Sequence, residues 1–162
     1  MKNISIISQK IFLRNDIIAQ AARWKFLGKT IAFTNGIFDL LHDGHIFSLS
    51  QAAKEADVLI VGVNSDASTK RLKGTERPVN NEQSRALLLA SMIITDAVVV
   101  FEEDTPYELI MSIMPDMIVK GGDYTVDQVA GGKEVIANGG KVIINPVLEG
   151  YSTTKIISNI KG

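Results

Sequence analysis

The chain has 162 residues, no cysteine, and a formal net charge of −1 from 17 basic and 18 acidic side chains. This length suits a single domain, residues 1–162, which can bury a core without covalent staples. The balanced charge excludes the global electrostatic footprint of a nucleic-acid binder. The lack of cysteine excludes disulfides and thiolate metal sites, and no run approaches the roughly 18 apolar residues that a membrane helix needs. We therefore expect a cytoplasmic protein with neither nucleic acid nor membrane as a partner.

The first half of the chain alternates between helical and strand patterns. Apolar residues at helical spacing predict a helix over residues 15–28, with Gly28 as its C-terminal stop. The apolar run 30–35 predicts a buried strand, and residues 44–55 carry a second helical face. Another buried strand is predicted over residues 58–63, and it ends in an Asn-Ser-Asp turn.

The second half begins with a polar stretch, residues 68–81, which predicts the longest loop of the chain. The alternation then resumes. The predicted helices cover residues 82–92, 106–114 and 133–138 with a last one beginning near Ser152, and the predicted strands cover residues 97–101, 117–122 and 141–145.

Most of the predicted strands are continuous apolar runs. That pattern is typical of a parallel sheet covered on both faces, so we expect an α/β fold with an open parallel sheet of about five strands and helices on both sides. Ligands of such folds bind beyond the carboxyl ends of the strands. The polar segments at those ends are TNGIFDLLHDGH, NSD, KGGDY and the residues before STTK.

The only two histidines of the chain, His42 and His45, lie three residues apart between a predicted strand and a predicted helix. In the first turn of a helix, free backbone N–H groups and the helix dipole favour an anion. Two imidazoles at this point suit a phosphate that gains charge during a reaction. Two alternatives are a metal pair completed by Asp39 or Asp43, and surface histidines without a function.

The stretch TNGIFDLLHDGHIFSL resembles the signature of the cytidylyltransferase-like nucleotidyltransferases, a strand followed by G-x-F-D-x-x-H-x-G-H and a helix. The positions that fill this pattern are Gly36, Phe38, Asp39, His42, Gly44 and His45. A second family element, a Ser/Thr-rich turn at the start of the last helix, is similar to Ser152-Thr153-Thr154-Lys155. Taken alone, that turn is better explained as a plain helix N-cap. Paired with HDGH in the right order along the chain, it favours a site for the outer phosphates of a triphosphate.

Within this family the chain is most similar to the ADP-heptose synthases. The similar segments are FTNGIFDLLHDGH, VGVNSDASTKRLKG, RPVN, FEEDTP, VKGGDY and GYSTTKII. The resemblance implies an adenylyltransferase of lipopolysaccharide synthesis, which moves AMP from ATP to D-glycero-β-D-manno-heptose 1-phosphate and releases pyrophosphate. In many bacteria this domain is fused to a sugar kinase, and the chain is expected to be the stand-alone form.

The resemblance also implies roles for individual residues. It places the triphosphate against the turn Thr34, Asn35, Gly36 and Phe38, with His42 and His45 on its phosphates and Ser152, Thr153 and Thr154 at its outer end. Gly121, Asp123 and Tyr124 are expected beside the nucleoside, or else to form a plain strand-to-helix turn. Asp66 is expected to contact a ligand hydroxyl or orient the base, although it also suits a structural turn.

Arg85 follows the long loop at a position where the family keeps a basic residue near the pyrophosphate; the alternative is an exposed helical arginine. Basic residues in the loop, Lys70, Arg71, Lys73 and Arg77, surround Gly74 as a hinge. Such a cluster is often only a solvated face. Because the acceptor phosphate must be neutralised, we assign Lys73 (also as a catalytic group) and Arg77 to acceptor binding. Asp39 of the motif is assigned to acceptor binding as well.

The predicted substrates are ATP and a sugar phosphate, with Mg²⁺ bridging the triphosphate oxygens and no protein residue named as its ligand. A homodimer is expected because relatives of this fold tend to form dimers. Two rival functions remain. One is CTP-dependent transfer to a polyol or amino-alcohol phosphate such as glycerol 3-phosphate, and the other is a nucleotide-binding sensor without turnover.

Overall fold

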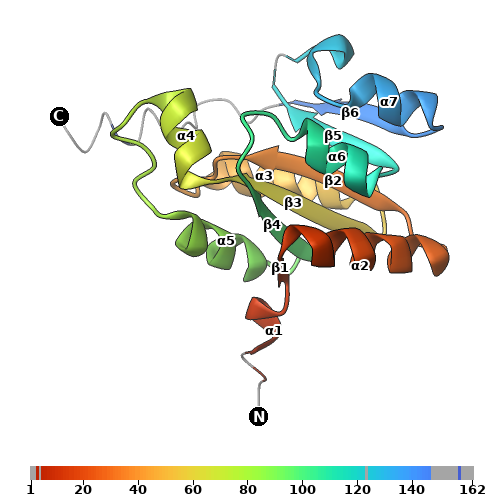
Figure 1. Cartoon of the computed structure of the whole chain (residues 1–162), viewed down its shortest axis with the longest axis horizontal. Coiled ribbons are helices and arrows are strands. Elements are labelled where there is room, and N and C mark those ends of the chain that lie inside the picture. Colours follow the sequence, from red (N-terminus) through yellow and green to blue (C-terminus); the bar gives the residue numbers. More distant parts are fainter. Residues whose placement is uncertain (1–2, 4, 123, 147–156, 158–162) are drawn as a thin grey trace.

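A computed structural model describes residues 3, 5–122, 124–146 and 157 of the chain. Its centre is a parallel sheet of six strands in the order β1-β4-β3-β2-β5-β6 (Figure 1). The strands are β1 (Ile11–Phe12), β2 (Ile31–Gly36), β3 (Val58–Asn64), β4 (Ala97–Phe101), β5 (Met117–Gly121) and β6 (Lys141–Asn145). The five predicted strands are thus confirmed, and the two-residue β1 is added at the edge beside β4.

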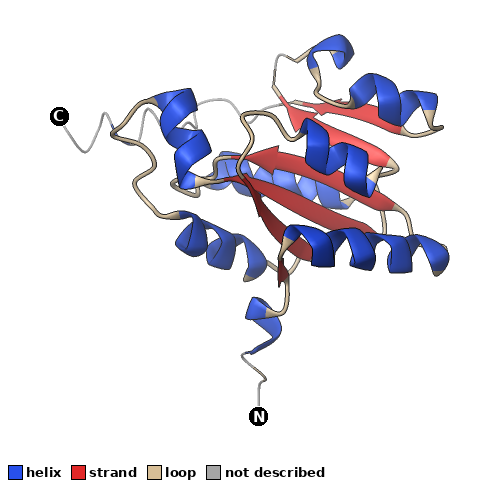
Figure 2. Cartoon of the chain, in the orientation of Figure 1, coloured by secondary structure: helices blue, strands red, loops and turns tan. Residues whose placement is uncertain are grey.

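Helices cover both faces of this sheet, as predicted (Figure 2). They are α1 (Ser5–Ser8), α2 (Arg14–Phe26), α3 (Asp43–Ala53), α4 (Asp66–Lys73), α5 (Glu82–Ala90), α6 (Tyr107–Ile113) and α7 (Gly132–Ala137), with a short 3₁₀ turn at Val126–Gln128. None of the helices in the described ranges is long and apolar enough to cross a membrane. The helix expected near Ser152 falls outside the described residues.

The core divides into two layers because successive strand residues point to opposite faces. On one face, Phe33 of β2 and Ile60 of β3 pack with Ile17 of α2 and with α6 and α7. On the other face, Val61 of β3 packs with Leu49 of α3 and with α5. All seven residues of β3 are buried, which explains why its sequence is a continuous apolar run rather than an alternating one.

The prediction of a loop over residues 68–81 is wrong for its first part, which belongs to helix α4. The side chain of Ser65 caps this helix by accepting a hydrogen bond from the Ser68 backbone N–H at 3.1 Å. The inner face of α4 buries Ser68 and Thr69 instead of large apolar residues, so no apolar period marks the helix in the sequence. Gly74 ends the helix with a φ of 97°, a conformation that favours glycine.

The chain order places a topological switch point between β2 and β5. From β2 the chain continues to β3 and β4 on one side of the sheet, then crosses to β5 and β6 on the other side. The ladder between β2 and β5 pairs Ala32 with Met117 and Phe33 with Ile118, and it stops before the carboxyl ends of both strands. Open α/β sheets bind ligands at such a point.

Candidate active site

The turn that follows β2 is shaped by a close contact between Gly36 and Phe38. Phe38 adopts a φ of 52°, in the left-handed region that a bulky residue rarely occupies. Its ring folds back over Gly36, where a Cβ atom would lie 3.0 Å from the ring. The ring is 8% exposed and meets the His45 imidazole edge-on, with 5.3 Å between the ring centroids. Phe38 therefore packs against the His45 ring, and Gly36 leaves the space that this packing needs.

The two histidines lie at the start of α3, as their spacing predicts. His42 is the N-cap residue, and its carbonyl oxygen accepts a hydrogen bond from the His45 backbone N–H at 2.9 Å. The imidazole rings stack with 3.9 Å between their centroids. Both side chains thus face the same point beside the positive end of the helix.

The imidazoles are uncharged at neutral pH. Burial, and after it the charge on His42, lowers the pKa of His45 to about 4, although a hydrogen bond to the Leu40 backbone opposes the shift. Burial also lowers the pKa of His42, although Asp43 opposes the shift. The buried Nδ1 atom of His45 has no hydrogen-bond partner among the described residues. A neutral imidazole retains one N–H donor, so the pair can donate hydrogen bonds to an anion.

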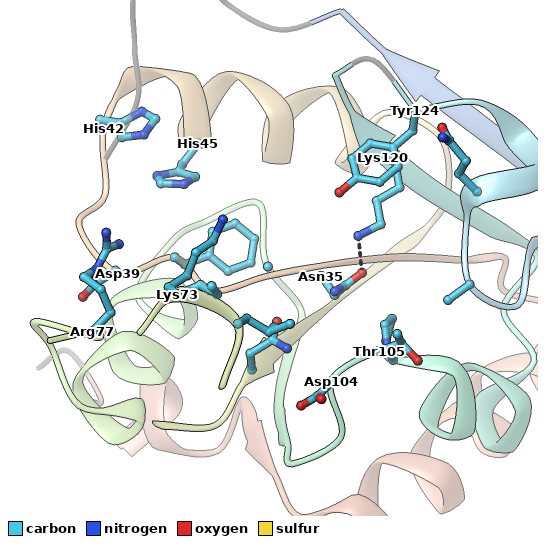
Figure 3. A pocket seen from close by; sticks show the side chains of 18 residues that line it. Asn35, Asp39, His42, His45, Lys73, Arg77, Asp104, Thr105, Lys120 and Tyr124 are labelled. Carbon is cyan, nitrogen blue, oxygen red and sulfur yellow. Dashed lines mark hydrogen bonds and ion pairs between the residues drawn. The ribbon is translucent and has the colours of Figure 1, made fainter. Parts of the chain in front are cut away.

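Two cavities meet at these histidines. The larger, of about 660 Å³, extends from the turn after β2 to Lys73, Arg77 and Asp104 (Figure 3). The smaller, of about 280 Å³, lies between Thr34, Gly121 and the start of α3. Eight residues line both cavities: Asn35, Gly36, Ile37, Phe38, His42, His45, Lys120 and Tyr124. A small group held at this shared wall is therefore accessible from both sides.

Asp39 connects the turn after β2 to the segment that follows α4. Its carboxylate, 1% exposed, accepts hydrogen bonds from Arg77 Nε at 2.7 Å and from the backbone N–H groups of Val79 and Asn80 at 2.8 and 2.9 Å. Burial alone would raise the pKa of Asp39, but the hydrogen bonds from Asn80 and Val79, together with Arg77, hold the pKa below its ordinary value. Asp39 therefore remains ionised and fixes Arg77 at the edge of the larger cavity.

Arg85 is buried, so the alternative of an exposed helical arginine is wrong. Neither Arg85 nor Asp66 lines the two cavities. The Arg85 side chain is 0% exposed and donates hydrogen bonds to three carbonyl oxygens, those of Ile37, Asn64 and Asn80. It also forms an ion pair with Asp66 at 2.7 Å. These contacts join the turn after β2 to the end of β3, so the structure gives Arg85 a supporting position behind the site.

Most of the other predicted site residues lie together. Thr34, Asn35, Gly36 and Phe38 line one or both cavities, and so do Gly121, Tyr124, Lys73 and Arg77. Asp123, Ser152, Thr153 and Thr154 lie outside the described residues. Their expected contacts, with the nucleoside for Asp123 and with the outer phosphates for the other three, therefore stay predictions.

The sequence analysis assigned no role to Lys120 or to the loop after β4, although the segments that contain them, KGGDY and FEEDTP, were singled out. Lys120 precedes the two glycines of KGGDY and lines both cavities, while Asp104, Thr105 and Pro106 line the larger one. The available signal was position: Lys120 lies near the end of one predicted strand and the loop follows another, where side chains gather at the carboxyl edge of the sheet. Lys120 is the one lysine among the residues that line both cavities.

Comparisons with known proteins identify the family of the chain. The model of a family described as cytidylyltransferase-like matches residues 33–159. The chain is 47% identical over 161 residues to the bifunctional protein HldE of Rhodospirillum rubrum, covering 99% of this chain and 32% of that protein. It is 54% identical over 134 residues to the HldE protein of Shigella flexneri serotype 5b, covering 83% of this chain and 28% of that protein. The chain thus spans about a third of the length of these curated relatives.

Two solved structures share the fold. The lipopolysaccharide core biosynthesis protein of Thermoplasma volcanium aligns with a TM-score of 0.62 and 30% identity, over 77% of this chain and 100% of that chain. The pantoate-beta-alanine ligase of Francisella tularensis aligns with a TM-score of 0.61 and 17% identity, over 93% of this chain and 76% of that chain. The second likeness bears on the fold alone.

Proposed function

The chain belongs to the cytidylyltransferase-like family, and from this premise we propose that it is an adenylyltransferase. It transfers AMP from ATP to a sugar 1-phosphate, D-glycero-β-D-manno-heptose 1-phosphate, and releases pyrophosphate. The observation that carries this proposal is the shared wall of the two cavities, because a group passed between two substrates must lie within reach of both. His42 and His45 stand at that wall.

The chemistry requires positioning and charge stabilisation. A phosphate oxygen of the acceptor attacks the α-phosphorus of ATP, a new P–O bond forms, and the bond from the α-phosphorus to the β-bridging oxygen breaks. The electron pair of that bond leaves with pyrophosphate. The acceptor oxygen is already anionic at neutral pH, so no general base and no covalent intermediate are needed. Neutral imidazole N–H groups of His42 and His45 donate hydrogen bonds to the oxygens that gain charge.

The larger cavity is the proposed site of the acceptor. Lys73 and Arg77 line this cavity on the side away from Lys120 (Figure 3), and both are cations suited to a phosphate. The smaller cavity, between β2, β5 and α3, is proposed to hold the ATP phosphates nearest the nucleoside, beside the positive end of α3. The sugar is assigned as a heptose because the segments quoted above resemble the ADP-heptose synthases.

Mg²⁺ is proposed to arrive with ATP. The described residues contain no group of three or more His, Asp or Glu side chains that could hold a metal ion. The ion would neutralise part of the triphosphate charge through the phosphate oxygens.

A homodimer is also proposed. Its support is a group of exposed apolar side chains on and after α5, namely Leu87, Leu88 and Ile93, which are 50%, 44% and 96% exposed. A second copy of the chain would shield them from water. Light scattering at micromolar concentration tests this state, and a monomeric mass would contradict it.

The enzymatic proposal is tested by pyrophosphate release with a panel of substrates. ATP and CTP are each combined with D-glycero-β-D-manno-heptose 1-phosphate, with glycerol 3-phosphate and with water alone. We expect rapid release only from ATP with the heptose phosphate. Faster release from CTP with glycerol 3-phosphate would assign the chain to the cytidylyltransferases, and binding of ATP without release in any mixture would make it a sensor.

A further inference from the structure

We propose that Lys120 is a catalytic residue, whose ammonium group contacts the phosphate that is being transferred at the wall shared by the two cavities. This inference rests on the proposed function, since it names a further group that acts in the same reaction. It starts from the position of Lys120 at the carboxyl end of β5. Lys120 lines the larger and the smaller cavity alike, as do His42 and His45.

The switch point of the sheet explains why Lys120 reaches this wall. The backbone ladder between β2 and β5 ends at Phe33 and Ile118. If the same register continued for two more residues, Asn35 would lie opposite Lys120. There the backbones no longer pair, and Lys120 Nζ instead donates a hydrogen bond to Asn35 Oδ1 at 2.6 Å (Figure 3). The side chain thus bridges the crevice in which ligands of such sheets bind.

Two contacts hold the ammonium group in a fixed place. The Asn35 side-chain oxygen accepts a hydrogen bond from one N–H of the ammonium group. An ammonium has three N–H donors, so two remain for a ligand. The Tyr124 ring lies on another side, with 5.5 Å between Lys120 Nζ and the ring centroid. No carboxylate among the described residues lies within 4 Å of Nζ. A partly buried cation without such a carboxylate is suited to receive the negative charge of a ligand.

Charge at the shared wall points to the same residue. The two histidines there are neutral at pH 7 and supply hydrogen bonds but no net charge. The other residues that line both cavities carry no ionised group at this pH except Lys120. The transition state gains negative charge on the α-phosphate and on the leaving pyrophosphate. Lys120 is therefore the one full positive charge that the described shared wall can offer to the reacting phosphate.

The pH dependence follows from the surroundings of Lys120. Burial lowers its pKa to about 8. Lys120 donates to the uncharged Asn35. The charged and titratable groups that share its cavities come from α3 and its N-cap, from α4 and from the loops: His42, His45, Tyr124, Asp39, Asp104, Lys73 and Arg77. The charged form is the active one, so kcat/KM for ATP should fall as the pH rises above about 8.

The test compares Lys120→Met and Lys120→Arg with the unchanged chain. We expect Lys120→Met to lower kcat by about 10²-fold or more, the size of effect seen when one donor to a developing oxyanion is lost. Lys120→Arg should recover at least a tenth of the normal rate. It should also lose the fall above pH 8, because a guanidinium stays charged up to about pH 12. Lys141→Met, at the exposed start of β6, is the matched control and should leave both kinetics and pH profile unchanged.

Three outcomes would overturn the assignment. A folded Lys120→Met variant with a rate within threefold of normal would make the residue a tether between β2 and β5. If kcat/KM for ATP still falls above pH 8 in Lys120→Arg, that titration belongs to another group. This comparison tests the role of Lys120 even if Lys120→Met fails to fold. If the unchanged chain releases no pyrophosphate, the proposed function fails first, and calorimetry with ATP alone then decides: equal ATP affinity of Lys120→Arg and the unchanged chain at pH 9.5 would remove Lys120 from the phosphate site.

Discussion

Replacing Arg85 with methionine should destabilise the fold, because Arg85 joins the turn after β2 to the end of β3 behind the active site. Methionine matches the length of the arginine stem but donates no hydrogen bond. The substitution removes four interactions at once: those to the carbonyl oxygens of Asn80, Ile37 and Asn64, at 3.0, 2.6 and 2.8 Å, and the ion pair with Asp66 at 2.7 Å. The acceptors would stay in place without their donor.

The expected loss can be worked from these contacts. A buried acceptor that loses its donor costs about 1 to 3 kcal/mol, and breaking a buried ion pair costs about 3 to 5 kcal/mol. Asp66 is 31% exposed, so water can take over part of its pairing. At the low end of the range for a lost donor, the three carbonyl oxygens alone would cost about 3 kcal/mol, so we expect the free energy of unfolding to fall by about 3 kcal/mol or more. Domains of this kind have about 5 to 15 kcal/mol of stability, so the loss is a large share of it.

Urea denaturation monitored by circular dichroism measures this loss directly. Arg71→Met is the matched control, since its ion pair with Asp104 is exposed, with 47% and 51% of the two side chains accessible. A pair of that kind contributes about 0 to 1 kcal/mol. If Arg85→Met changed the free energy of unfolding by no more than Arg71→Met does, the supporting position of Arg85 would be refuted. A stable Arg85→Met variant without activity would return Arg85 to the pyrophosphate.

Three further predictions concern the site itself. His42→Ala or His45→Ala should each lower turnover by about 10²-fold or more while the fold persists, because each removes one hydrogen-bond donor from the shared wall; near-normal turnover of either folded variant would contradict the role. Lys73→Ala should lower kcat/KM for the acceptor by about 10-fold to 150-fold, the range that a charge-assisted contact implies, and leave ATP affinity by calorimetry unchanged; the reverse pattern would mean that Lys73 serves ATP. The pKa of His45 is near 4 in the folded chain and near 6.5 in the unfolded chain, so only the unfolded state binds a proton between these values and stability must fall as the pH drops from 6.5 to 4. The stability of His45→Asn, measured by thermal unfolding, should fall less steeply with pH over that window. An unchanged slope would contradict the claim that the folded chain holds His45 as a neutral imidazole.

Local patterns were sufficient to predict most of the fold. The apolar runs at 58–63 and 97–101 predicted buried strands because a strand covered on both faces needs apolar side chains on both. Gly28, with a φ of 74°, follows α2 just where a helix favours a left-handed residue. The order of a strand, two histidines and a helix likewise follows from short-range sequence, and it placed His42 and His45 correctly at the start of α3.

The errors share a physical origin in contacts between distant segments. Helix α4 was missed because its inner face is made of Ser68 and Thr69, whose hydroxyl groups give no apolar period. The alternative of an exposed Arg85 was wrong, because the burial of this residue depends on carbonyl oxygens up to 48 residues away in the chain. Lys120 meets Asn35 only because β5 lies beside β2 in the sheet. Strand order of that kind does not appear in hydrophobic spacing along one chain.

The central claim is that the chain transfers AMP to a sugar phosphate, and identification of the product by ³¹P NMR tests it most directly. ATP, Mg²⁺ and D-glycero-β-D-manno-heptose 1-phosphate would be incubated with the chain and followed over time. The predicted result is a pair of diphosphate-ester signals from an ADP-linked sugar, formed in equal amount to free pyrophosphate and absent with His45→Ala. Unchanged ATP and sugar phosphate, or signals of ADP and inorganic phosphate alone, would contradict the account.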